Sequence, residues 1–207
     1  MMHLGRVLMC LTLGLSCKKP AAEAPEAQPT VTLLSSHQGP PIPVTYDVLS
    51  VGFEAGQSFE AIQETVAAAL VVPMESVHRT KDNEVMVDLR HADPSLRTSV
   101  SAEKLKKVRG LIFARPVAQS GHKYWSFGRM FHVKLKQSTS IEQLTVLAAQ
   151  HDCALLKKHE YLTGVYVLDP GPKNDYDPVK MANVFFETKL FEETSPTGQV
   201  FRAPPPY

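Results

Sequence analysis

FHVKLKQSTSIEQLTVLAAQHDCALLKKHEYLTGVYVLDPGPKNDYDPVKMANVFFETKLFEETS, residues 131–195, is the stretch that decides the fold. Its first residues, 131–136, alternate between apolar and polar side chains. A period of two is typical of a half-buried strand. After a short polar turn, Ser140 stands at a helix N-cap position, and Gln143 follows at the spacing of a capping box. We therefore predict a strand followed by a helix.

The rest of this stretch predicts two further strands, a second helix and a last strand. The apolar runs 154–158 and 164–168 contain β-branched or aromatic residues, which favour strands. Asp177 can cap a helix that has Pro178 at its first position, where a missing N–H costs nothing. Another strand is expected near residues 191–194. The order β-α-β-β-α-β is that of a split βαβ, ferredoxin-like unit.

An earlier part of the chain predicts the same order of elements. The expected elements are a strand at 46–53, a helix capped by Ser58, strands at 77–79 and 84–89, a helix capped by Ser101, and a strand at 111–114. The sequence from Val51 parallels the sequence from Val133 without gaps. This match favours a tandem repeat, although any two stretches with this element order look alike at this level.

We therefore predict an α+β protein made of two tandem ferredoxin-like (βαββαβ) modules, each with an antiparallel sheet and its helices on one face. The modules are residues 44–118 and 131–195, and residues 119–130 form an aromatic connector between them. The connector contains Tyr124, Trp125 and Phe127. We expect these rings to fill the interface between the modules, which is a more common outcome than an exposed binding patch.

The N-terminal region has the features of an export signal. Arg6 precedes an apolar run at residues 7–15, which is too short to span a membrane. Residues 13–17, LGLSC, resemble a bacterial lipobox, so we expect residues 1–17 to be a lipoprotein-type signal peptide and Cys17 to be lipidated. The alternative is an ordinary secretory signal that is cleaved elsewhere. Residues 18–43 are rich in Pro and Ala and are predicted to be a tether.

The net charge and the cysteine content narrow the possible classes of function and partner. The net charge of +1 offers no basic stripe, so we expect no nucleic-acid partner. Of the three cysteines, Cys10 lies in the signal and Cys17 would carry lipid. Cys153 is then left alone, and we interpret it as a small buried hydrophobe rather than a nucleophile.

Several blocks of residues 131–195 resemble the propeptide domain of bacterial, lipoprotein-type subtilisin-like serine proteases (subtilases). The blocks are residues 131–136 (FHVKLK), 144–148 (LTVLA), 165–168 (VYVL) and 179–191 (VKMANVFFETKLF). The resemblance implies a ferredoxin-like fold, and it implies a partner, the catalytic domain of a subtilisin-like serine protease. It also implies that the open face of the sheet packs on the protease while the following segment enters the active-site cleft.

The chain lacks the residues that would make it a protease. No segment resembles the D-T-G, H-G-T or G-T-S-M-A signatures of subtilases, and no G-x-S-x-G elbow occurs. No Cys/His spacing suits zinc, and no glycine-rich loop suits a phosphate. We interpret Asp169, Asp175 and Asp177 as a turn with a helix cap, and His151 and His159 as surface residues. We therefore predict no catalytic residues, no metal and no cofactor.

The Pro-rich segment 196–207 is the part that would lie in a protease cleft. Within it, Gln199, Val200, Phe201 and Arg202 are the most substrate-like residues. Strand pairing should stop before Pro204, since proline cannot donate a backbone hydrogen bond. The alternative is a disordered end.

Three functional hypotheses follow. The first is an exported lipoprotein of the cell envelope, anchored by lipid to a bacterial membrane (the outer membrane or the cell surface), that inhibits or helps to fold a subtilisin-like serine protease. The second is the N-terminal part of a subtilase whose catalytic domain is missing. The third is a cell-surface binding or scaffold module with no role in proteolysis.

Overall fold

The computed structural model describes residues 30–31, 41–81 and 83–202, and these form an α+β protein with an antiparallel sheet and four α-helices. The predicted signal peptide, Cys17, residues 18–29 and 32–40 of the predicted tether and residues 203–207 of the predicted Pro-rich segment lie outside this part of the chain. The elements are β1 (Thr30–Val31), β2 (Ile42–Phe53), α1 (Phe59–Leu70), η1 (Met74–Ser76), β3 (Val77–Lys81), β4 (Glu84–Asp88), η2 (Pro94–Leu96), α2 (Ser99–Leu105), β5 (Leu111–Ser120), β6 (Lys123–Leu135), α3 (Ile141–Gln150), β7 (Ala154–Lys158), β8 (Val165–Asp169), η3 (Pro172–Asn174), α4 (Pro178–Glu187) and β9 (Phe191–Arg202).

The first half of the molecule, β2 to β5, has the strand order β3-β4-β2-β5, with antiparallel pairing throughout. Leu49, Val51 and Phe53 alternate along β2 and are buried with the apolar faces of α1 and α2. Ser58 caps α1 as predicted, because its hydroxyl accepts a hydrogen bond from the amide of Ala61 at 3.2 Å. This half therefore has a core of its own between the sheet and its two helices.

The helix α2 begins earlier than the sequence predicts. Its N-cap is Thr98, whose hydroxyl accepts from the amide of Val100 at 3.3 Å. Ser101, the predicted cap, is buried inside the helix and donates its hydroxyl to the carbonyl of Thr98 at 3.0 Å. The prediction of Ser101 as a cap was wrong, because Thr98 already has the extended backbone of an N-cap (φ −136°, ψ −179°) and Ser101 lies within the helix.

The second half, β6 to β9, has the strand order β9-β6-β8-β7, again antiparallel. Its core is centred on Phe185 of α4, whose ring centroid lies 5.1 Å from that of Phe131 and 5.6 Å from that of Phe191. The capping box at the start of α3 is confirmed: Ser140 and Gln143 each bond the other's backbone N–H through their side chains. Asp177 caps α4 as predicted.

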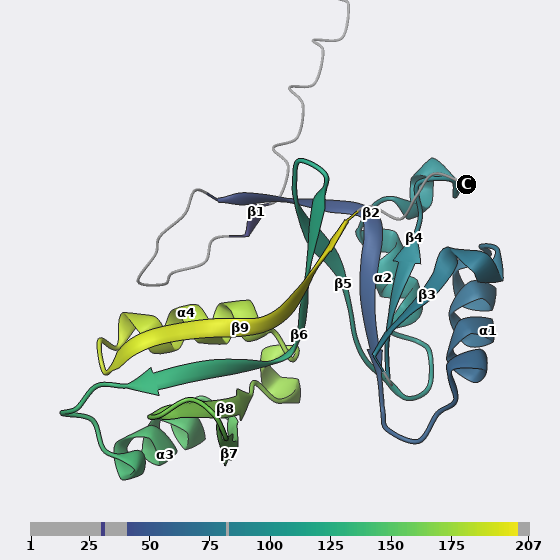
Figure 1. The fold of residues 1–207 in the computed structure, drawn as a ribbon. Coiled ribbons are helices and arrows are strands. Elements are labelled where there is room, and N and C mark those ends of the chain that lie inside the picture. The colour runs from purple at the N-terminus through teal and green to yellow at the C-terminus, as the bar shows by residue number, and fades with distance from the viewer. Residues whose placement is uncertain (1–29, 32–40, 82, 203–207) are drawn as a thin grey trace, which may run out of the picture.

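The predicted connector, residues 119–130, is strand rather than linker. It forms the end of β5, a tight turn with Gly121 at φ 58°, and the first part of β6. Consequently one long strand, β6, belongs to the hairpin with β5 at one end and to the second half at the other (Figure 1). The turn needs a positive φ, which explains the glycine at this position.

The last strand runs farther than predicted, from Phe191 to Arg202. Its pairing with β6 is interrupted between Phe131, opposite Pro196, and Phe127, opposite Gly198. Pro196 therefore stands beside an irregularity of the ladder, where a residue without an N–H is tolerated. Beyond the break, the predicted protease-binding residues Gln199 to Arg202 resume pairing with β6.

The side of the first half's sheet that faces away from α1 and α2 is also covered. Val48, Met86 and Val117 form a second apolar cluster there with Tyr124 of β6, and Phe201 of β9 packs against it. A buried hydrogen bond of 2.7 Å from the hydroxyl of Ser126 to that of Ser50 joins β6 to β2. The ribbon of β6 and β9 thus covers part of this side.

Candidate functional site

The second half leaves one side of its sheet free of its own helices, and we call this side the open face. Residues paired directly across an antiparallel ladder point to the same side. The open face therefore holds His132, Lys134, Lys157, Val165, Val167, Glu193 and Ser195. The helices α3 and α4 pack on the opposite side, against Phe131 and Val133 (Figure 1).

Polar and aromatic side chains cover the open face. Lys134 forms an ion pair of 2.6 Å with Glu192, and both side chains remain exposed to solvent. Val165 and Val167 in the neighbouring strand β8 are only 7% and 3% exposed. The face therefore offers charged groups above a buried apolar strip.

A row of rings runs from the open face to the β7–β8 turn. The rings of His132 and His159 meet edge to face at 5.5 Å, and His159 contacts Tyr161, which is 86% exposed. Burial lowers the pKa of His132, the charge on His159 lowers it further, and Glu193 opposes this shift. His159, predicted to be a simple surface residue, is thus part of a partly buried histidine pair.

The predicted protease-binding residues lie in β9 and face two ways. Phe201 packs against the apolar cluster that contains Tyr124, whereas Val200, opposite Trp125, is 51% exposed. Gln199 pairs with Ser126. The segment predicted to trail free of the module is therefore held in a strand, and only some of its side chains are accessible.

Cys153 is buried, as predicted, with 8% of its surface exposed. Burial raises the pKa of its thiol to about 11, and the charges of Asp169 and Asp152 add to this. Its sulfur lies 3.6 Å from the carbonyl of His151. A thiol in these surroundings stays protonated at neutral pH and is a poor nucleophile.

The three aspartates near the start of α4 have the roles predicted for a turn and a cap. Asp169 accepts from the amide of Gly171 at 2.9 Å and pairs with Arg129 at 2.5 Å. Asp177 accepts from the first amides of α4. No group of three or more His, Cys, Asp or Glu side chains suited to a metal occurs among the residues that the structure describes.

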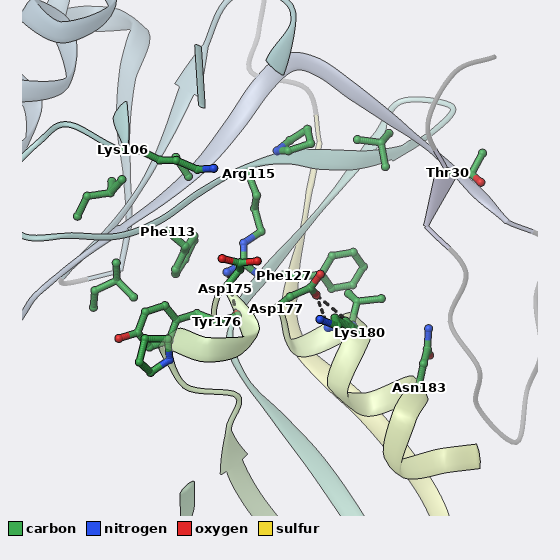
Figure 2. Close-up of a pocket in the computed structure, with 17 residues that line it drawn as sticks. Thr30, Lys106, Phe113, Arg115, Phe127, Asp175, Tyr176, Asp177, Lys180 and Asn183 are labelled. Atoms are coloured by element: carbon green, nitrogen blue, oxygen red, sulfur yellow. Dashed lines mark hydrogen bonds between the residues drawn. The ribbon is translucent and has the colours of Figure 1, made fainter. Parts of the chain in front are cut away.

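A cavity of about 830 Å³ lies between the two halves (Figure 2). One wall is β5, from which six consecutive residues, 111–116, line the space. The opposite wall is the segment from η3 into α4, including Asp175, Tyr176 and Lys180. No local pattern of residues predicts this cavity, because its two walls are far apart in the chain.

Arg115 of β5 points across this cavity toward the turn before α4 (Figure 2). Its Nη2 donates to the carbonyl of Tyr176 at 2.9 Å, and its guanidinium lies 4.2 Å from the ring centroid of Phe113. Burial lowers its pKa to about 10, and the charges of Asp177, Glu84 and Asp175 oppose the shift. The guanidinium is therefore still charged at neutral pH.

The ring of Phe113 has room on the sheet because residue 52 is glycine. A Cβ added to Gly52 would lie 2.3 Å from that ring. The ring in turn packs against the guanidinium of Arg115. A single charged residue inside the apolar run LIFARPVA is the feature of the sequence that could have identified this arginine.

No protein-family model and no curated protein matches this chain. Within the described part of the chain, no helix combines the length and apolar character needed to cross a bilayer. The assignment of function accordingly depends on the geometry of the open face and of the cavity.

Proposed function

We propose that the two halves are tandem ferredoxin-like modules and that the second module binds the catalytic domain of a subtilisin-like serine protease, as an inhibitor or a folding aid. The strand order β9-β6-β8-β7, with α3 and α4 on one side, supports the module assignment for the second half. The first half has the equivalent order β5-β2-β4-β3. The resemblance to subtilase propeptides in residues 131–195 supports the choice of partner.

The observation that carries this proposal is the open face of the second half. A binding surface needs accessible side chains on a rigid support, and strands β6, β8 and β9 supply that support. The exposed residues Lys157 and Glu193, together with Tyr161 at the adjacent turn, can contact a partner without disturbing the core. A polar surface with one large exposed aromatic residue is typical of interfaces that form and dissociate.

The end of β9 is held in the sheet, so in this proposal it does not make the first contact with the protease. Phe201 would have to leave the cluster around Tyr124 before residues 199–202 could lie in an active-site cleft. Val200 is accessible without that change. We therefore assign first contact to the open face, and entry of the β9 end into the cleft to a later step.

The proposal includes export and anchoring in the cell envelope through a lipid on Cys17. It is supported by the apolar run at residues 7–15 and by the lipobox-like residues 13–17. Mass spectrometry of the mature N-terminus tests it: a diacylglyceryl mass on Cys17 supports the anchor, and an unmodified N-terminus at another residue contradicts it.

The binding function is tested with purified subtilisin-like serine proteases. The protein is mixed with each protease, and hydrolysis of a chromogenic peptide is followed over time. Inhibition, or faster refolding of a denatured catalytic domain in the presence of the protein, is the expected result. If the protein neither inhibits nor assists refolding of any member of the panel, the proposal is wrong.

A further inference from the structure

The cavity between the two halves runs along the free edge of a strand. On a strand, consecutive side chains point to opposite faces, so a cavity on one face would be lined by alternate residues. Here consecutive residues, 111–116 of β5, line the cavity. The space therefore lies beside the strand rather than above one face of it.

This edge of β5 has no strand partner within the part of the chain that the structure describes. One side of β5 pairs with β2, and the other side pairs with β6 only at residues 118–120. In an antiparallel ladder, every second residue turns its N–H and C=O away from a given neighbour. Along residues 111–116, those outward groups face the cavity, and the wall opposite them is a helix start, not a strand.

An unpaired strand edge is a template for another extended chain. The part of this edge that can pair with another chain ends before Pro116, since proline has no N–H to donate. Residues 111–115 are left, and Arg115 stands at their end with its guanidinium in the cavity. The free edge and the arginine thus mark two parts of one elongated site.

The charge of the cavity favours a carboxylate near Arg115. Among the residues that the structure describes, the guanidinium has one hydrogen-bond partner, the carbonyl of Tyr176. Its remaining N–H groups suit the paired hydrogen bonds that a carboxylate accepts. Lys106 and Lys180 line the same space, as do Asp175 and Asp177, so with Arg115 the lining carries one more positive than negative charge. The carboxylate of Asp177 already accepts two amides of α4.

We propose that this cavity is a peptide-binding site: an extended peptide pairs with the free edge of β5 and places a carboxylate, from an acidic side chain, on Arg115. The backbone of β5 supplies affinity without demanding particular side chains, and Arg115 supplies selectivity for acidic peptides. The site lies between β5 and the segment from η3 into α4, and none of its lining residues belongs to the open face. It is therefore independent of the proposed protease interaction.

The test uses fluorescein-labelled peptides that alternate Thr and Val around one central Glu, with a matched peptide that has Gln in its place. Fluorescence anisotropy is measured with the protein alone, in the absence of any protease. We expect the Glu peptide to bind about tenfold more tightly than the Gln peptide. Methylation of alternate backbone nitrogens should abolish binding in one register and leave it intact in the other, because only one set of N–H groups faces β5.

Variants of the protein complete the test. Arg115→Met should bring the affinities for the Glu and Gln peptides to the same value, while Arg109→Met, an exposed arginine outside the lining, should leave the difference unchanged. Because Arg115→Met could disturb folding, Arg115→Lys is measured as well; it keeps the charge and should reduce the preference for Glu only in part. Circular dichroism shows whether each variant is folded.

Three results would overturn the proposal. They are the absence of binding at millimolar peptide, equal binding of the Glu and Gln peptides by the unaltered protein, and insensitivity to backbone methylation in both registers. A failure of the protease assay leaves these measurements unaffected, so the two proposals can be refuted separately.

Discussion

The two halves have the same succession of elements, but they differ in what covers the side of the sheet opposite the helices. In the first half that side is covered by Tyr124 and Phe201 and joined to β6 by the hydrogen bond between Ser126 and Ser50. In the second half the corresponding side carries charged residues and histidines. A sheet face that its own chain covers has a structural role, whereas a polar face that no described helix or strand covers can serve as a binding surface.

The largest loss of stability is expected on replacing Phe201, which packs against the side of the first half's sheet opposite its helices. Phe201→Ala should lower the free energy of unfolding by about 2–3 kcal/mol, since the ring packs against Val48, Met86 and Val117 and its loss leaves a void. The neighbouring change Val200→Ala, at a half-exposed position, should cost no more than about 0.5 kcal/mol. Chemical denaturation of both variants measures the difference. Equal effects would mean that the end of β9 does not cover the first half.

A smaller effect is expected at the Ser126–Ser50 hydrogen bond. Ser126→Ala should cost about 1–2 kcal/mol, because the hydroxyl of Ser50 is then buried without its partner. The double variant Ser50→Ala/Ser126→Ala should be more stable than the sum of the two single changes predicts. A double-mutant cycle by denaturation measures this coupling. A coupling of zero would indicate that the two halves are not joined through these hydroxyls.

The smallest effect on stability is expected at the open face, and it depends on pH. The folded state lowers the pKa of His132, so the unfolded chain binds the proton more readily. Well above about pH 6.5, His132 should therefore have no effect on the free energy of unfolding. As the pH drops through that value, the free energy of unfolding should fall, and it should stop falling below the pKa of His132 in the folded state. His132→Asn should remove this contribution. Denaturation of both proteins between about pH 7.5 and pH 5 provides the comparison. Parallel pH profiles for the unaltered protein and the His132→Asn variant would contradict the assignment of this pH dependence to His132.

Local signals in the sequence predicted most of the elements. The capping residues Ser58, Ser140 and Asp177 and the alternation in residues 131–136 each act within a few residues, so they can be recognised without the fold. What could not be predicted were the strand ends. Strands were predicted at residues 111–114 and near 191–194, but β5 and β9 continue past Pro116 and Pro196 to Ser120 and Arg202.

The sites were predicted less well, for a physical reason. The residues of the predicted protease-binding tail are held in β9 by pairing with β6, and Phe201 packs against a cluster from β2, β4, β5 and β6, all of which lie far earlier in the chain. The cavity at Arg115 likewise needs β5 and the turn before α4 to meet. Interactions between distant segments leave no periodic pattern in a single sequence. The open face, by contrast, follows from the alternation within β6.

The most direct test of the central claim compares one charge reversal on the open face with the same reversal elsewhere. Lys157→Glu lies on the open face and Lys107→Glu lies on the first half, and both lysines are exposed, so neither change should alter stability much. The measurement is the inhibition constant toward a subtilisin-like protease that the unaltered protein inhibits. We expect Lys157→Glu to change the inhibition constant about tenfold and Lys107→Glu to leave it unchanged. Equal inhibition constants for the two variants would contradict the claim that the open face of the second half is the docking surface.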